Sequence, residues 1–352
     1  MPVLQRPIGT TRDGITVERF TLRGDGGVEV DVLTYGGTLA ALRAPDAAGV
    51  VGDVVLGFDS LEPYLGTHLY MGSLVGRYGN RIAGGRFRLG DREYRLACNN
   101  GPNHLHGGPG GFHRQVWGAE ALDGAHPAVR LRYLSRDGEE GYPGNLDVTV
   151  TYTVAGDELR IDYLATTDQE TVVNLTSHAY FNLSGGGDIL GHLVEIPAAR
   201  FVPVGPTLIP TGELRPVAGT PLDFRVPTAV GARIGDDDEQ LRNAGGYDQT
   251  WALDKTPGEL GLAARVTDPA SGRVLEMLTT EPGVQLYTGN VIAGELLGHG
   301  GQTYARHSGL CLEAQHFPDS PNQPAFPSTT LRPGETYRQT TVYRLALAAK
   351  LV

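Results

Sequence analysis

Two side chains in this sequence could act as an acid and a base. His178 lies in the segment VVNLTSHAYFNL (residues 172–183), and Glu313 stands between Leu312 and Ala314 in a strand-like segment. Histidine titrates near neutral pH, and a carboxylate among apolar residues is costly unless it is paired or functional. A core histidine and a structural salt bridge are the simpler explanations of the two residues. Together, however, they could perform general acid–base catalysis.

Polar residues are concentrated in other segments that could bind a small molecule. Asn80 and Arg81 are adjacent in the segment GRYGNRI (residues 76–82), although Arg81 could simply lock a loop by pairing with a carboxylate. Asp248 lies between Tyr247 and Trp251, and Gln285 lies in EPGVQLYTGN. Carboxylates and amides beside aromatic rings suit sugars, but a half-buried strand would also explain the aromatic residues.

The segment NNGPNHLHGG (residues 99–108) contains a His-x-His pair, His104 and His106. In an extended chain these two side chains would face the same side, as a metal site would require. A metal site needs three or four ligands with supporting contacts, and no other candidate ligand has a spacing signature. We therefore expect no metal.

Motifs for other chemistries are missing from the sequence. There is no P-loop, HExxH, CxxC or GxSxG motif, and the glycine-rich stretches 107–111 and 185–187 do not lie in a strand–helix unit that could hold a nucleotide. We therefore expect side-chain acid–base chemistry without a cofactor.

Composition narrows the choice of partners and compartment. The chain has 352 residues and a formal net charge of -11, which argues against a nucleic-acid partner. No apolar run approaches the roughly 18 residues of a membrane span, and residues 1–12 lack the apolar region of a secretory signal. We expect a cytoplasmic protein without a membrane partner, in which Cys98 and Cys311 are buried thiols.

The periodicity of the sequence predicts the elements that position these residues. Residues 148–154 (VTVTYTV) and 159–164 (LRIDYL) alternate around a four-residue turn, which predicts a β-hairpin, and residues 86–96 repeat this form. Further strands are predicted at 128–134, 274–279 and 341–347, and short helical turns at 61–65 and 239–244. With 50 glycines and 23 prolines spread along the chain, the pattern predicts an all-β protein, a single large antiparallel β-sandwich domain over residues 1–352.

Five of these segments, in this order, resemble the aldose 1-epimerase (galactose mutarotase) family. The similar segments are Asn80-Arg81-Ile82, Asn103-x-Leu105-His106-Gly107-Gly108, residues 174–183, residues 282–290, and Glu313-x-Gln315 with the following residues 322–324 and 331–334. The resemblance implies the galactose mutarotase-like supersandwich with a sugar cleft on one face. It also implies a role for each matched residue: Glu313 as general base, His178 as general acid, His106 near the ring oxygen, and Asn80, Arg81, Asp248 and Gln285 as sugar-binding positions.

This resemblance predicts an isomerase that interconverts the α and β anomers of free galactose or glucose, as a monomer or homodimer without a cofactor. Three alternatives remain: a non-catalytic carbohydrate-binding sandwich, a phosphosugar 1-epimerase and a glycoside hydrolase. A hydrolase normally needs two carboxylates beside the bond, and only Glu313 is prominent. The acidic net charge and the missing extra basic cluster count against a phosphosugar.

Overall fold

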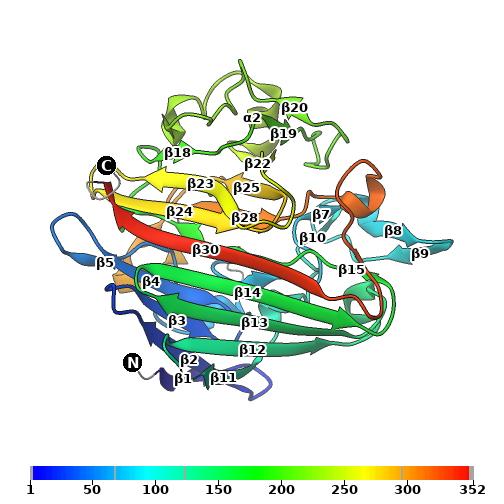
Figure 1. The fold of residues 1–352 in the computed structure, drawn as a ribbon, viewed down its shortest axis with the longest axis horizontal. Helices are drawn as coiled ribbons and strands as arrows, with labels where there is room; N and C mark the ends of the chain where they lie inside the picture. The colour runs from blue at the N-terminus through cyan, green and yellow to red at the C-terminus, as the bar shows by residue number, and fades with distance from the viewer. Residues whose placement is uncertain (1–2, 67–68, 123, 295, 349–352) are drawn as a thin grey trace.

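Antiparallel strands are the main regular elements of the chain in the computed structural model, which describes residues 3–66, 69–122, 124–294 and 296–348. The largest sheet has nine strands. In spatial order they are β11 (Gly118–Leu122), β12 (Ala128–Ser135), β13 (Leu146–Ala155), β14 (Glu158–Thr167), β30 (Tyr337–Leu347), β24 (Arg273–Thr279), β23 (Gly261–Thr267), β18 (Leu193–Glu195) and β21 (Thr228–Ala229). In Figure 1, β14, β30 and β24 lie side by side across the middle of the molecule.

Two further sheets pack with the nine-stranded sheet. The six-stranded sheet contains β17 (Tyr180–Phe181), β28 (Leu310–Gln315), β25 (Gly283–Tyr287), β22 (Asp248–Ala252), β19 (Arg200–Val202) and β20 (Arg215–Pro216). The five-stranded sheet contains β1 (Leu4–Thr10), β2 (Thr16–Arg23), β3 (Glu29–Leu33), β4 (Leu39–Pro45) and β5 (Val51–Asp53). One hydrophobic core joins all three sheets, with Val30, Val150 and Leu312 as one member from each. The expected β-sandwich is therefore confirmed.

Short paired strands and helical turns complete the fold. The pairs are β7 (Arg81–Ile82) with β10 (His104–Leu105), β6 (Leu74–Val75) with β16 (Thr176–Ser177), β15 (Thr171–Val172) with β29 (Thr330–Leu331), β8 (Arg86–Leu89) with β9 (Arg92–Arg95), and β26 (Leu296–Leu297) with β27 (Thr303–Tyr304). The helices are α1 (Glu62–Leu65), α2 (Glu239–Ala244), η1 (Ala83–Gly85), η2 (Phe112–Arg114), η3 (Glu139–Gly141), η4 (Val230–Ala232), η5 (His299–Gly301) and η6 (Ser320–Asn322). No helix in the described part of the chain is both long and apolar enough to cross a membrane.

The β13–β14 hairpin shows why the sequence pattern folds as it does. Val148, Val150, Tyr152 and Val154 are buried in the core, while the threonines between them are partly exposed. This is the period of two that a half-buried strand requires. Gly156, at φ +62°, forms the turn between the paired residues Ala155 and Glu158. The predicted hairpin is confirmed.

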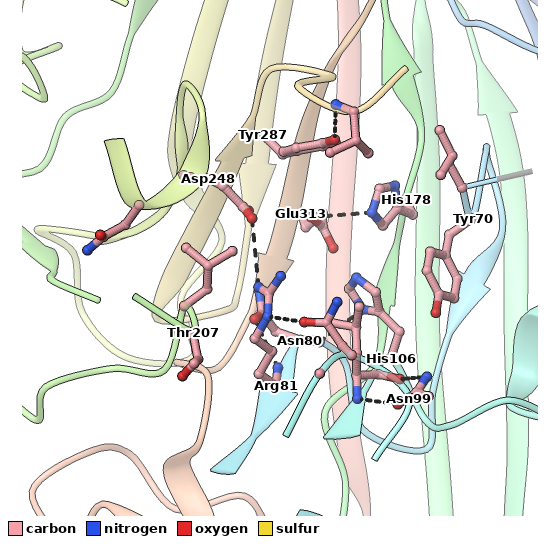
Figure 2. A pocket seen from close by; sticks show the side chains of 18 of the residues that line it. Tyr70, Asn80, Arg81, Asn99, His106, His178, Thr207, Asp248, Tyr287 and Glu313 are labelled. Carbon is pink, nitrogen blue, oxygen red and sulfur yellow. Dashed lines mark hydrogen bonds and ion pairs between the residues drawn. The ribbon is translucent and has the colours of Figure 1, made fainter. Parts of the chain in front are cut away.

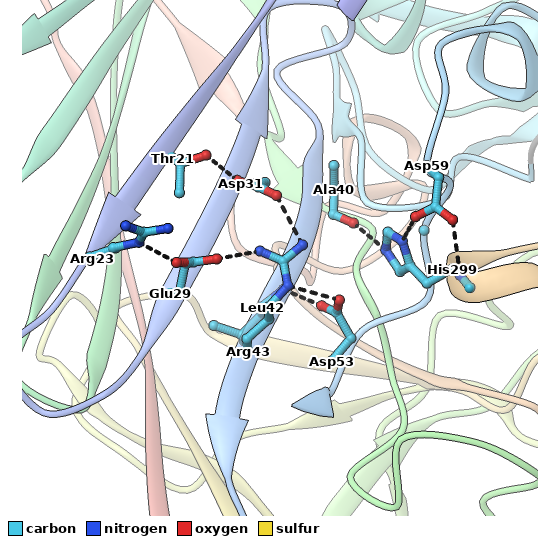
Figure 3. A network of polar contacts seen from close by, with 12 residues as sticks. Thr21, Arg23, Glu29, Asp31, Ala40, Leu42, Arg43, Asp53, Asp59 and His299 are labelled. Carbon is cyan, nitrogen blue, oxygen red and sulfur yellow. Dashed lines mark hydrogen bonds and ion pairs between the residues drawn. The ribbon is translucent and has the colours of Figure 1, made fainter. Parts of the chain in front are cut away.

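Charged residues link neighbouring strands of the five-stranded sheet (Figure 3). Arg43 on β4 contacts Glu29 at 2.6 Å, Asp31 at 3.0 Å and Asp53 at 3.2 Å. Beside this cluster, His299 contacts Asp59 at 2.9 Å and the carbonyl oxygen of Ala40 at 2.8 Å. The second contact joins η5 to β4, so these polar groups contribute to the architecture.

One sequence expectation about the cysteines is wrong. Cys311 is buried on β28, but Cys98 is exposed, and both are free thiols. Cys98 lies between β9 and β10, in a stretch with no regular secondary structure. The tendency of thiols to be buried is a statistical preference, which a surface loop does not have to follow.

Candidate active site

A cleft of about 600 Å³ lies beside β28. It is lined by residues from distant parts of the chain, among them Asn80, Arg81, His106, His178, Asp248 and Glu313. Figure 2 shows these side chains converging on one space. The structure therefore brings six of the seven predicted site residues together in the cleft wall.

His178 and Glu313 face each other in this cleft. The Nε2 atom of His178 lies 3.8 Å from Oε1 of Glu313, and the two side chains are only 5% and 2% exposed (Figure 2). This separation is too long for a hydrogen bond. Oε2 of Glu313 has no hydrogen-bond partner among the described residues. The carboxylate can therefore accept a proton or hydrogen bond from a bound molecule.

The alternation of β28 explains how a carboxylate comes to lie there. Leu312 and Ala314 belong to the main hydrophobic core, so the side chain of Glu313 between them points to the opposite face. His178 follows the short strand β16, and Tyr180 two residues later pairs with Cys311 on β28. This pairing brings the histidine to the same face of the sheet as Glu313.

The surroundings of Glu313 make it a stronger base. Burial raises the pKa of Glu313 well above its usual value, and the nearby negative charge of Asp248 adds to the rise. The positive charge of Arg81 acts in the opposite direction. Since a proton acceptor works best when its pKa is near the operating pH, this environment suits a general base.

Asn80 and Arg81 are held by the β7–β10 ladder. Asn80 has φ +62°, a left-handed conformation that asparagine tolerates better than most residues. Its side-chain oxygen accepts the N–H of Arg81 at 2.9 Å. The Nε atom of Arg81 donates to Asn100 at 2.9 Å, and its Nη1 atom lies 3.7 Å from Asp248. An ion pair with a carboxylate, the simpler explanation of Arg81, is therefore present, and it lies inside the cleft.

His106 is fixed in one tautomer by its backbone neighbour. The N–H of Asn80 donates to Nδ1 of His106 at 3.0 Å, so the proton of the neutral ring is on Nε2. Burial lowers the pKa of His106 well below its usual value, and the positive charges of His178 and Arg81 lower it further. His106 is therefore neutral and can donate a hydrogen bond through Nε2.

This tautomer also decides whether the cleft suits a metal ion. Ligand atoms of His106, His178 and Glu313 all lie within 4.8 Å of one another, which is the arrangement of a possible three-ligand site. A neutral imidazole has a single nitrogen lone pair for a metal, and that of His106 already accepts the Asn80 N–H. The donor set therefore does not fit a metal unless this backbone contact breaks.

His104 does not share the face of His106. His104 is fully buried, its Nδ1 contacts the carbonyl oxygen of Ala97 at 2.8 Å, and its Nε2 contacts the hydroxyl of Tyr142 at 2.6 Å. Burial lowers the pKa of His104 to about 4. Because His106 has φ +52°, the chain is not extended there, and the alternation expected for the His-x-His pair is lost.

Gln285 is the predicted site residue that does not line the cleft. It is 2% exposed, and its Nε2 donates to Oδ1 of Asp248 at 2.7 Å. It therefore lies behind the wall of the cleft and contacts this wall through its hydrogen bond to Asp248. Asp248 itself is in the wall, between Gln285 and Arg81.

Several aromatic and amide side chains of the site were missed at the sequence level. The ring of Tyr70 lies edge-on to His106 at 4.7 Å and is 5.7 Å from that of His178. Asn99 holds the backbone of Leu105 with two hydrogen bonds, of 2.8 and 3.0 Å. Tyr180 and Tyr287 also line the cleft. The signal was partly available, because Asn99, Tyr180 and Tyr287 lie in the polar and aromatic segments already singled out, whereas Tyr70 lies in none of them.

Comparison with known proteins shows which family the chain belongs to. The family model described as aldose 1-epimerase matches residues 18–344. Galactose mutarotase from Mus musculus is 49% identical over 337 residues, covering 95% of this chain and 96% of the relative. Aldose 1-epimerase from Escherichia coli (strain K12) is 37% identical over 336 residues, covering 94% of this chain and 96% of the relative.

Solved structures give the same result. A GalM/aldose epimerase homologue from C. elegans superposes with a TM-score of 0.85 at 31% identity, covering 94% of this chain and 98% of the other. A galactose 1-epimerase from Lactobacillus acidophilus superposes with a TM-score of 0.86 at 27% identity, covering 98% and 99% of the two chains. The resemblance therefore extends over nearly the whole fold.

Proposed function

This chain belongs to the aldose 1-epimerase family and interconverts the α and β anomers of aldoses, and we propose that His178 and Glu313 transfer the protons of this reaction. The observation that carries the proposal is the 3.8 Å approach of His178 Nε2 to Glu313 Oε1 in a cleft of sugar size. A single acid and a single base are what the opening of a hemiacetal requires.

The proposed reaction begins with the cyclic sugar. Glu313 removes the proton from the C1 hydroxyl, while His178 gives a proton to the ring oxygen, so that the C1–O5 bond breaks and an aldehyde forms. Rotation about the C1–C2 bond turns the aldehyde over, and ring closure with the two roles exchanged yields the other anomer. No electron or group leaves the substrate. Each proton transfer contributes on the order of 10²–10⁴ in rate.

Three neighbouring residues support these transfers in the proposed mechanism. His106, as a neutral donor, and Arg81, as a fixed cation, stabilise the negative charge that develops on the ring oxygen. Asn80 positions both of them through its backbone and side chain. Asp248 accepts hydrogen bonds from sugar hydroxyls, with Gln285 behind it.

We propose a free hexose, galactose or glucose, as the substrate rather than a phosphosugar. Among the described residues lining the cleft, Arg81 is the sole lysine or arginine, and Asp248 already faces it. A phosphate would need further positive charge. We also propose that the enzyme works in the cytoplasm, where the exposed thiol of Cys98 would stay reduced, and as a monomer or homodimer.

The proposal is tested by polarimetry on freshly dissolved α-galactose, α-glucose and a hexose phosphate. Glu313→Gln and His178→Asn should each slow the optical rotation change by at least about 100-fold while the variants still fold. A variant with near wild-type rates would remove that residue from the mechanism. Sugar binding without any acceleration by the wild-type protein would instead favour a carbohydrate-binding module.

A further inference from the structure

Three residues form a row across the strands behind the cleft. Gln285 on β25 lies directly opposite Thr250 on β22 and, on its other side, directly opposite Glu313 on β28. Directly opposed residues of antiparallel strands have their side chains on the same face of the sheet. The row Thr250–Gln285–Glu313 therefore runs from the interior of the sheet to the proposed base.

Hydrogen bonds define the orientation of the Gln285 amide in this row. Gln285 donates through Nε2 to Asp248 at 2.7 Å, and the hydroxyl of Thr250 donates to Oε1 of Gln285. The opposite amide orientation would place Oε1 against the Asp248 carboxylate, where two acceptors would repel each other. Thr250 is 1% exposed and does not line the cleft. Its hydroxyl therefore stabilises the orientation of the Gln285 amide in which Nε2 donates to Asp248.

Asp248 is consequently held on both of its oxygens. Oδ1 accepts from Gln285, and Oδ2 lies 3.7 Å from Nη1 of Arg81, with the Asp248 side chain 14% exposed. A carboxylate fixed in this way has little freedom to turn toward or away from the base. Asp248 and Arg81 are also the two charges that act in opposite directions on the pKa of Glu313.

We propose that Thr250 is a positioning residue, which fixes the amide of Gln285 and, through it, the Asp248 carboxylate beside Glu313. This inference rests on the proposed function of Glu313. Without the threonine hydroxyl the amide of Gln285 loses the partner of its Oε1 atom. Asp248 then keeps Arg81 as its stronger partner, and the position of its carboxylate relative to Glu313 is no longer fixed. The simpler alternative is that Thr250 merely fills space in a strand, as β-branched residues commonly do.

The Thr250→Val substitution separates the two explanations, because valine keeps the shape and removes the hydroxyl. We expect kcat/KM to fall about 10-fold, as for the loss of one well-placed hydrogen bond, and the acid limb of its pH profile to shift, because the charge of Asp248 acts on the pKa of Glu313. Thr250→Ser should retain near wild-type values of both. The matched control is Thr341→Val, because Thr341 is a buried strand threonine whose hydroxyl contacts Thr279 and lies outside the cleft lining.

A double-mutant cycle with Gln285→Met tests whether Thr250 acts through Gln285, and Thr250→Ala replaces Thr250→Val in this cycle if the valine variant folds poorly. If Thr250 acts through Gln285, the double variant should have the same pH profile and nearly the same kcat/KM as Gln285→Met alone. The inference is overturned if Thr250→Val matches Thr341→Val within twofold in kcat/KM and in pH profile, or if the two losses simply add. Glu313→Gln, measured in parallel, keeps this result distinct from the proposed function: an active Glu313→Gln would overturn the assignment of the base itself.

Discussion

Two histidine–glutamate pairs lie at strand β28, one with Glu313 on the strand and one with His316 just after it, and their geometries differ. In the cleft, His178 Nε2 and Glu313 Oε1 are 3.8 Å apart. At the end of the strand, Nδ1 of His316 lies 2.6 Å from Oε2 of Glu281, in a closed hydrogen bond. The closed geometry suits a structural contact, whereas the open geometry suits the proton transfers proposed for His178 and Glu313.

The Nδ1 atoms of the two histidines also have different neighbours. For His316 this neighbour is the Glu281 carboxylate. Burial lowers the pKa of His316, but the charge of Glu281 and the hydrogen bond to it outweigh burial and raise the pKa above its usual value. The Nδ1 atom of His178 lies 3.5 Å from the thiol of Cys311, which carries no charge because burial raises the pKa of Cys311 well above its usual value. A neutral thiol does not hold a proton on its histidine as a carboxylate does.

Removing either member of the open pair should have the largest effect on activity. Glu313→Gln and His178→Asn each delete a proton-transfer group, and we expect mutarotation to slow by at least about 100-fold in each variant. Polarimetry on α-galactose would measure this, with circular dichroism to show that the fold is retained. The matched control is Glu281→Gln, which should stay within about threefold of wild type because the closed pair does not line the cleft. Equal losses in all three variants would refute the distinction between the pairs.

Arg81 tests how charge tunes the open pair. Arg81→Met removes the cation that opposes the rise in the pKa of Glu313, so that this pKa should rise further. Because the ionised carboxylate is the active base, the acid limb of the kcat/KM profile should move to higher pH. We expect a loss of about 10- to 100-fold near pH 7, since charge stabilisation at the ring oxygen is lost as well. An unchanged acid limb with reduced activity would restrict Arg81 to binding the sugar.

The sequence was most informative where the signal is local. The alternation of residues 148–164 predicted the β13–β14 hairpin, because the period of two and the turn at Gly156 both act within one segment. The apolar flanks of Glu313 correctly predicted a buried carboxylate. The pairing of Glu313 with His178 was predicted from the family resemblance, because the two residues are far apart in the chain and no local pattern joins them.

Features that depend on strand register or unusual backbone geometry could not be predicted. The place of Gln285 beside the cleft follows from its register with Thr250 and Glu313, which one sequence does not reveal. The turning of His106 away from the face of His104 requires the positive φ of His106, which is rare for a non-glycine residue. The interpretation of the two histidines as neighbours on one face failed for this reason.

Breaking the closed pair, His316 and Glu281, should lower the stability of the protein rather than its activity. The pKa of His316 is raised in the folded state. The contact between His316 and Glu281 therefore contributes fully to stability below the unfolded-state pKa of about 6.5, and this contribution is lost as the pH rises through the folded-state pKa. Glu281→Gln should therefore lower the free energy of unfolding by about 1–3 kcal/mol at pH 6 and by less at pH 9. Urea denaturation at both pH values would measure this. As a control, Asp59→Asn should cost less than about 1 kcal/mol, because Asp59 is 66% exposed beside His299 (Figure 3). A loss for Glu281→Gln that grows with pH would contradict this sign.

The smallest expected effect concerns the thiol neighbour of His178. Cys311→Ala removes a weak sulfur contact 3.5 Å from Nδ1 and leaves Glu313 in place, so we expect kcat to fall by only about two- to fivefold. Cys311→Ser, which retains a polar hydrogen at this position, should recover most of the loss. Cys98→Ala is the matched control, because that thiol is exposed and outside the cleft, and its rate should equal that of the wild type. A 100-fold loss in Cys311→Ala would show that His178 depends on the thiol as strongly as a histidine depends on a carboxylate neighbour. The contrast with the closed pair would then lie in the distance between the partners and not in the chemistry of the Nδ1 neighbour.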